Sequence, residues 1–168
     1  MKNEETNDIA RKIVETLTHK GRTVATAESC TGGAIAVAIT AIPGSSAMFK
    51  GGIVAYSNEV KANVLGVSEE TLATYGAVSE ETVLQMAQGA RALLKTDYAV
   101  ATSGIAGPGG GTPEKPVGTV WMAIAAGDKT SAYCLRQNDQ GRNKNIELAV
   151  QHALNLLLQE IECCESAQ

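Results

Sequence analysis

Stretches with strand-like and helix-like hydrophobic patterns alternate along almost the whole of this chain. Residues 6–20 place apolar side chains at every third or fourth position, which predicts an amphipathic helix, and residues 97–103 form a short apolar run that predicts a buried strand. Such alternation is typical of α/β domains, in which helices cover both faces of a sheet. Because no linker-like segment interrupts it, we predict a single three-layer α/β/α domain over residues 1–168.

The other elements are predicted in the same way. Further strands are expected at residues 23–26, 53–56, 117–126 and 130–136, and further helices at 33–42, 58–65, from 78 and from 142. The last two strands are close enough in sequence to form an antiparallel hairpin, so the sheet should be mixed. The sequence Val-Ser-Glu-Glu-Thr occurs at 67–71 and again at 78–82, and each copy places a serine N-cap before two acidic residues.

Composition excludes several classes of protein. Apolar residues make up 44% of the chain and charged residues 19%, which excludes an intrinsically disordered chain. A net charge of -4 and an aromatic content of 4% argue against a nucleic-acid partner. The sequence contains no apolar run of the ~20 residues that span a bilayer, and its first residues are polar. We therefore expect a cytoplasmic protein without a membrane partner.

Neither the cysteines nor the histidines form a recognisable metal or catalytic motif. The four cysteines are Cys30, Cys134, Cys163 and Cys164. There is no Cys-x-x-Cys pair, and adjacent cysteines do not form an ordinary disulfide, so free thiols are expected. His19 and His152 lie far from every glycine-rich segment, which argues against a zinc site and a Ser-His-Asp triad. We expect neither a metal nor a cofactor.

Four polar, glycine-containing segments are the candidates for a functional site. They are residues 27–33, residues 43–46 followed by 56–61, residues 103–111 and residues 141–142. The first, Ala-Glu-Ser-Cys-Thr-Gly-Gly, either presents backbone amides to an anion at a helix N-terminus or is a structural turn. The third is too long to be a simple turn and is typical of a functional loop. A serine activated by a lysine is a chemistry that these segments allow.

Long motifs in these segments resemble the CinA C-terminal domain family. They are TAESCTGG, PGSSAMFKGGIVAYSNEVKANVLGV, YGAVSEETV and SGIAGPGGGTPEKPVGTVWMAIA, in this order, and the resemblance covers roughly residues 6–160. It implies a stand-alone nicotinamide-nucleotide amidohydrolase of pyridine-nucleotide salvage. Such an enzyme converts nicotinamide mononucleotide and water to nicotinate mononucleotide and ammonia by a metal-free serine/lysine mechanism.

The resemblance also implies roles for particular residues. The nucleophile falls on Ser46, the base on Lys61, and Tyr56 belongs to the same site. The positions implied to contact substrate are Ser29, Thr31, Gly32, Ser103, Gly104, Gly107 and Arg142. Arg142 would meet the phosphate or another polar part of the nucleotide.

Two departures from the family pattern affect phosphate binding. Gly141 stands where the family commonly has aspartate, and Ile146 stands where a second arginine is often found. A non-catalytic nucleotide-binding module therefore remains an alternative function. A small-molecule substrate is expected in either case, and a homo-oligomer is compatible with the sequence.

The proposed base must be neutral to accept a proton. With a reference pKa of about 10.4, roughly one lysine in a thousand is neutral near pH 7.4. Lys61 falls in the first turn of a helix capped by Ser57 or Asn58, where the positive helix end disfavours a cation, and burial would disfavour it further. We expect a lowered pKa for Lys61, with Tyr56 orienting the amine or relaying a proton and Glu59 facing solvent.

Two points are left open by the residues. Cys30, beside Ser29, is a rival nucleophile without a histidine partner. The oxyanion of the tetrahedral intermediate needs two donors, which could be backbone amides near Ser46 or in the loop 103–111.

Overall fold

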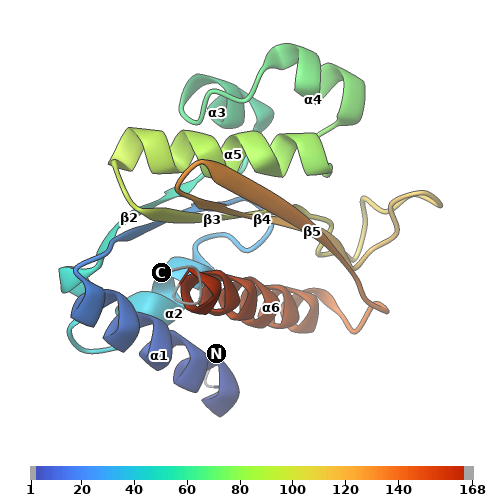
Figure 1. The fold of residues 1–168 in the computed structure, drawn as a ribbon. Helices are drawn as coiled ribbons and strands as arrows, with labels where there is room; N and C mark the ends of the chain where they lie inside the picture. The colour runs from blue at the N-terminus through green and yellow to red at the C-terminus, as the bar shows by residue number, and fades with distance from the viewer. Residues whose placement is uncertain (1–2, 165–168) are drawn as a thin grey trace.

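A five-stranded mixed sheet in the order β2-β1-β3-β4-β5 forms the centre of the protein, as the computed structural model of residues 3–164 shows (Figure 1). The strands are β1 (Val24–Glu28), β2 (Phe49–Val54), β3 (Tyr98–Gly104), β4 (Thr119–Ala126) and β5 (Lys129–Arg136). β1 pairs in parallel with both β2 and β3, whereas β4 is antiparallel to both β3 and β5. The prediction of a mixed sheet with a C-terminal hairpin is confirmed.

Helices cover both faces of this sheet, which confirms the predicted three layers (Figure 1). One face carries α1 (Glu4–Lys20), α2 (Ala34–Thr40) and α6 (Arg142–Cys163), and the other carries α5 (Glu80–Leu94) with α3 (Asn58–Asn63) and α4 (Glu69–Tyr75) beyond it. A short 3-10 turn, η1 (Ser45–Ala47), precedes β2. No helix among residues 3–164 is both long and apolar enough to cross a membrane.

The two faces of the sheet are packed with side chains of different size. The α1/α2/α6 face buries large aliphatic residues such as Ile13, Ile39 and Leu157. The α5 face of the sheet is built from alanines of β1, β3 and β4, which are Ala25, Ala27, Ala99, Ala101, Ala123 and Ala125. Side chains alternate between the two faces along a strand, so both cores follow from the same short apolar segments.

Both copies of the repeated cap sequence begin helices, as predicted. Ser68 accepts a hydrogen bond from Thr71 N (3.0 Å) at the start of α4, and Ser79 accepts one from Thr82 N (3.2 Å) at the start of α5. Each bond satisfies a backbone N–H that the first helical turn leaves without a partner.

β2 lies earlier in the sequence than predicted, at residues 49–54 in place of 53–56. The first part of this strand was not predicted because it contains Gly51 and Gly52, and glycine has a low strand propensity. Gly52 is required by packing, since a Cβ at this position would overlap the Thr26 hydroxyl on β1. The shift moves residues 55 and 56 beyond the carboxyl end of the strand, beside the end of β1.

Candidate active site

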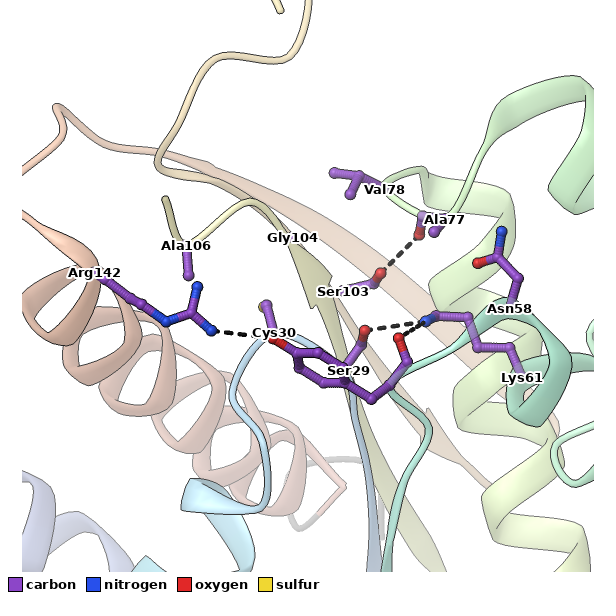
Figure 2. Close-up of a pocket in the computed structure, with 11 residues that line it drawn as sticks. Ser29, Cys30, Asn58, Lys61, Ala77, Val78, Ser103, Gly104, Ala106 and Arg142 are labelled. Carbon is purple, nitrogen blue, oxygen red and sulfur yellow. Dashed lines mark hydrogen bonds between the residues drawn. The ribbon is translucent and has the colours of Figure 1, made fainter. Parts of the chain in front are cut away.

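Ser29 and Lys61 meet at the carboxyl ends of β1 and β2. Ser29 follows the last residue of β1, and Lys61 is the fourth residue of α3, which begins shortly after β2. Lys61 Nζ donates hydrogen bonds to Ser29 Oγ (3.0 Å) and to the carbonyl oxygens of Ala55 (2.9 Å) and Tyr56 (3.5 Å). Figure 2 shows the lysine side chain reaching across to Ser29. The serine that touches the lysine is thus Ser29.

The Lys61 amine is buried, with only 1% of the residue exposed. Burial penalises the ammonium form and lowers the pKa of Lys61, an effect that the nearby Cys30 thiol opposes. Among residues 3–164 no carboxylate forms an ion pair with Lys61 that would restore its charge. The expected shift of the lysine pKa is therefore found, and its main cause is burial.

Local contacts explain why α3 holds Lys61 at this place. Ser57 caps the helix by accepting a hydrogen bond from Val60 N (3.2 Å), which selects Ser57 from the two predicted caps. Glu59 is exposed, as expected. After α3 the chain passes over α5 so closely that any side chain at Gly89 would overlap the Leu65 carbonyl. This close approach places the segment that follows α3 against α5.

Glu28, one residue before Ser29, anchors the turn between β1 and α2. Its carboxylate is 1% exposed and accepts hydrogen bonds from the backbone N–H groups of Gly33 (3.2 Å), Ile35 (3.0 Å) and Ala36 (2.8 Å). The amides at the start of α2 are thus occupied by a carboxylate of the chain itself. Of the two readings of this glycine motif, the structure supports a turn and not an anion site.

Thr31 and Gly32 belong to this turn and do not line the pocket described below. The Thr31 hydroxyl is 2.7 Å from Glu28 Oε2 and 2.8 Å from Thr102 Oγ1, so it ties the turn to β3. Gly32 adopts a φ of 60°, which favours glycine. The structure therefore gives these two predicted substrate-binding residues a supporting position behind Ser29.

Ser46 is not brought to Lys61, which corrects the expected pairing. Ser46 lies in η1, before β2, and is exposed, whereas Lys61 follows β2. A six-residue strand at about 3.3 Å per residue separates the two positions by about 20 Å. Ser46 therefore lies at the amino end of β2, whereas Ser29 lies at the carboxyl end of the neighbouring parallel strand β1.

A pocket of about 230 Å³ opens beside the Ser29–Lys61 pair (Figure 2). It is lined by Ser29, Cys30, Tyr56, Asn58, Lys61, Ala77, Val78, Ser103, Gly104, Ala106 and Arg142. Six of the ten expected site residues are in this lining, and Ser46, Thr31, Gly32 and Gly107 are not. The ends of the strands determine which residues of these segments face the pocket.

Arg142 closes the side of the pocket that lies opposite Lys61 in Figure 2. Its guanidinium donates to the Gly107 carbonyl (2.8 Å) through Nη1 and to the Tyr56 hydroxyl (3.0 Å) through Nη2. Gly107 thus contributes to the site by orienting Arg142 through its backbone carbonyl. The Tyr56 hydroxyl contacts Arg142, and only the Tyr56 backbone carbonyl approaches Lys61, so the expected contact of the phenol with the amine is absent among residues 3–164.

Asn145, which sequence reasoning missed, fixes the loops around Arg142. This fully buried side chain donates to the Ala106 carbonyl (3.1 Å) and to Asp139 Oδ1 (2.9 Å), and it accepts from Gln140 N (3.1 Å). It lies in α6, one turn after the start of the helix. An asparagine within an otherwise apolar helical stripe was the available signal. Ile146, the second departure from the family pattern, packs against the apolar core.

Ser103 and Cys30 complete the wall of the pocket. Ser103 Oγ donates to the Ala77 carbonyl (2.7 Å), which ties β3 to the segment before α5. Burial raises the pKa of the Cys30 thiol to about 12. Because the thiolate is the nucleophilic form, Cys30 is a poor rival to Ser29 near neutral pH. Within the described residues no cluster of three His, Cys, Asp or Glu side chains is placed to hold a metal ion.

Comparison with known proteins identifies sequences that are similar to this chain. The family model described as the CinA C-terminal domain matches residues 6–161. A nicotinamide-nucleotide amidohydrolase, PncC, from Escherichia coli K12 is 56% identical over 125 residues, which are 74% of this chain and 76% of that protein. A CinA-like protein of Parasynechococcus marenigrum is 47% identical over 90% of this chain. The chain spans 36% of the length of that CinA-like relative.

Solved structures have the same fold. The crystal structure of the competence/damage inducible protein CihA from Agrobacterium tumefaciens superposes with a TM-score of 0.93. The two chains are 46% identical, and the match covers 95% of this chain and 97% of that one. The fold of this chain is therefore shared with a solved structure of 46% identical sequence.

Proposed function

This chain belongs to the CinA C-terminal domain family, and we propose that it hydrolyses the carboxamide of nicotinamide mononucleotide, with Ser29 as nucleophile and Lys61 as general base. The products are nicotinate mononucleotide and ammonia, in a step of pyridine-nucleotide salvage. The observation that carries the proposal is the contact of Ser29 Oγ with the amine of a buried lysine that has no carboxylate partner among residues 3–164.

The three contacts of Lys61 suit a neutral amine. A neutral amine has two N–H donors and one lone pair. The carbonyls of Ala55 and Tyr56 can accept the two donors. The contact in which the ammonium donates to Ser29 Oγ then reverses in the neutral amine, and the Ser29 hydroxyl donates to the lone pair. A base arranged in this way takes the proton of the serine as the oxygen attacks.

The reaction then proceeds in two halves. Ser29 Oγ bonds to the carboxamide carbon while its proton moves to Lys61 Nζ, and the carbonyl oxygen becomes an oxyanion. Lys61 then donates the proton to the amide nitrogen, and the C–N bond breaks. Ammonia is released, and the acyl group remains on Ser29 as an ester. A water molecule, deprotonated by Lys61, cleaves this ester, so that Ser29 regains its proton and the nicotinate product is released.

Two contacts argue against some of the backbone amides that were candidates for oxyanion donors. Backbone amides near Ser46 lie at the other end of the sheet and cannot reach a carbonyl bound at Ser29. In the loop after β3, Ile105 N already donates to the Thr119 carbonyl (2.9 Å). Ser29 N likewise donates already, to the Thr102 carbonyl (2.9 Å). We therefore propose that the oxyanion lies near Cys30, Gly104 and Ala106, which line the pocket.

The alternative, a nucleotide-binding module without catalysis, needs no serine–lysine pair. Keeping an amine buried and away from a counter-charge is unfavourable, and binding alone gives no reason for it. This argues for the enzyme.

Release of ammonia from nicotinamide mononucleotide tests the proposal directly, with nicotinamide riboside and nicotinamide as comparators. We expect hydrolysis of the nucleotide to exceed that of either comparator. Binding of the nucleotide without ammonia release would instead support the non-catalytic module. The Ser29→Ala variant, assayed in parallel, excludes a contaminating amidase.

A further inference from the structure

The guanidinium of Arg142 is held from two sides by groups that come from distant parts of the chain. Nη1 donates to the Gly107 carbonyl in the loop after β3, and Nη2 donates to the hydroxyl of Tyr56, which follows β2. Arg142 itself is the first residue of α6. Three segments thus converge on one cation at the wall of the pocket.

The Tyr56 side chain is exposed, at 60%, so its position does not result from burial in a core. In the part of the chain that the structure describes, its hydroxyl has one hydrogen-bond partner, Arg142. Lys61 is oriented by Ser29 and by backbone carbonyls, without the phenol. Among the described residues no hydrogen bond joins the Tyr56 hydroxyl to Lys61, so the structure gives no path for a proton relay through the phenol.

We propose that Tyr56 is a positioning residue, which holds the Arg142 guanidinium in place to bind the phosphate group of the substrate. The identity of that substrate rests on the proposed function. A guanidinium has five N–H donors, and Tyr56 and Gly107 occupy two of them. Three donors remain for phosphate oxygens, and a guanidinium binds such oxygens in parallel pairs.

The role of the phenol is to restrict an otherwise mobile side chain. Arg142 is exposed, and an exposed arginine that is ordered only when the ligand arrives binds more weakly. Tyr56 acts on the bound phosphate and not on the reacting carboxamide. Tyr56→Phe should therefore raise KM for nicotinamide mononucleotide about fivefold, the equivalent of one hydrogen bond, and leave kcat within about twofold.

A double-mutant cycle with ribose 5-phosphate as the ligand tests the proposal without the amide chemistry. Calorimetry would measure its Kd for the unmodified protein, Tyr56→Phe, Arg142→Ala and the double variant. We expect Tyr56→Phe to weaken binding about fivefold and Arg142→Ala to weaken it more. The double variant should bind as Arg142→Ala does, because Tyr56 acts through the arginine. Tyr133→Phe, which removes a hydroxyl from an exposed tyrosine of β5, is the matched control.

Additive losses in the double variant, or a Tyr56→Phe variant with unchanged ribose 5-phosphate affinity, would overturn the proposal. So would a protein that does not bind ribose 5-phosphate. A fall in kcat at unchanged KM in Tyr56→Phe would also overturn it, because it would mean that Tyr56 acts in the chemical step. The cycle is independent of hydrolysis: coupled binding in a protein that releases no ammonia would retain this inference and reject the proposed function.

Discussion

Two serine-containing turns of this protein look alike in sequence and lie at opposite ends of the sheet. Ser29 follows β1, in a turn that leads into α2, and Ser46 precedes β2, in a 3-10 turn. Glycines lie near both serines, and both turns belong to the motifs that resemble the family. Only Ser29 touches Lys61. The comparison teaches that the end of the strand beside which a serine lies, more than the local motif, decides whether it can contact Lys61.

The two turns also differ in the contacts that hold them. The Ser29 turn is fixed by the buried carboxylate of Glu28, which binds three backbone N–H groups and the Thr31 hydroxyl. In the Ser46 turn it is Ser45 that is buried, and Ser46 is exposed to solvent. A catalytic side chain needs a fixed position relative to its base, and of the two serines only Ser29 contacts Lys61, the proposed base.

Removing the Ser29 hydroxyl should have the largest effect on activity. Ser29→Ala should lower kcat/KM for nicotinamide mononucleotide about 10⁴- to 10⁶-fold, as removal of a nucleophile does in serine hydrolases. Steady-state ammonia release checks this, and the melting temperature should stay close to that of the unmodified protein. A Ser29→Ala enzyme with near-normal turnover would reverse the comparison of the two turns.

Replacing the base should have the next largest effect. Lys61→Met keeps the length of the side chain and removes the amine, so kcat should fall about 10²- to 10⁴-fold. Stability should change little, because losing the hydrogen bond to the Ala55 carbonyl is offset by removing a buried amine. Thermal unfolding measured beside the kinetics separates the two effects. Equal loss of activity and folded protein would mean that Lys61 only supports the fold.

The pH profile sharpens the assignment of Lys61 as the base. Burial lowers its pKa, so kcat/KM should rise with pH, about tenfold per unit, and level off below the ordinary lysine value of about 10.4. The same shift makes the unfolded state bind more protons, so the free energy of unfolding should also rise with pH in the range between the two pKa values. The residual kcat/KM of Lys61→Met should not show this rise with pH. A profile identical in both enzymes would contradict the assignment.

Changing the second serine should have the smallest effect. Ser46→Ala removes an exposed hydroxyl about 20 Å from the pair, so kcat/KM should stay within about twofold. It is also the matched control for Ser29→Ala, since both remove one hydroxyl from a turn beside the sheet. A loss of turnover that equals the loss in Ser29→Ala would restore Ser46 as the nucleophile.

Properties encoded over short stretches of the chain were predictable from the sequence. Hydrophobic periodicity predicted the alternating elements and the C-terminal hairpin, and the caps at Ser68 and Ser79 were predicted from a serine followed by two acids. Burial of Lys61 was anticipated because its chemistry requires it. The predicted position of β2 was wrong because the packing of Gly52 against Thr26 overrides the low strand propensity of glycine.

The identity of the serine beside Lys61 was decided by tertiary structure alone. Ser46 is nearer to Lys61 along the chain, but β2 lies between them and carries them to opposite ends of the sheet. Ser29 is farther along the chain and close in space, because β1 runs parallel to β2 and the two strands end side by side. Strand order and direction are set by contacts between distant residues, which no local pattern encodes. The same holds for Tyr56, whose partner Arg142 lies 86 residues away.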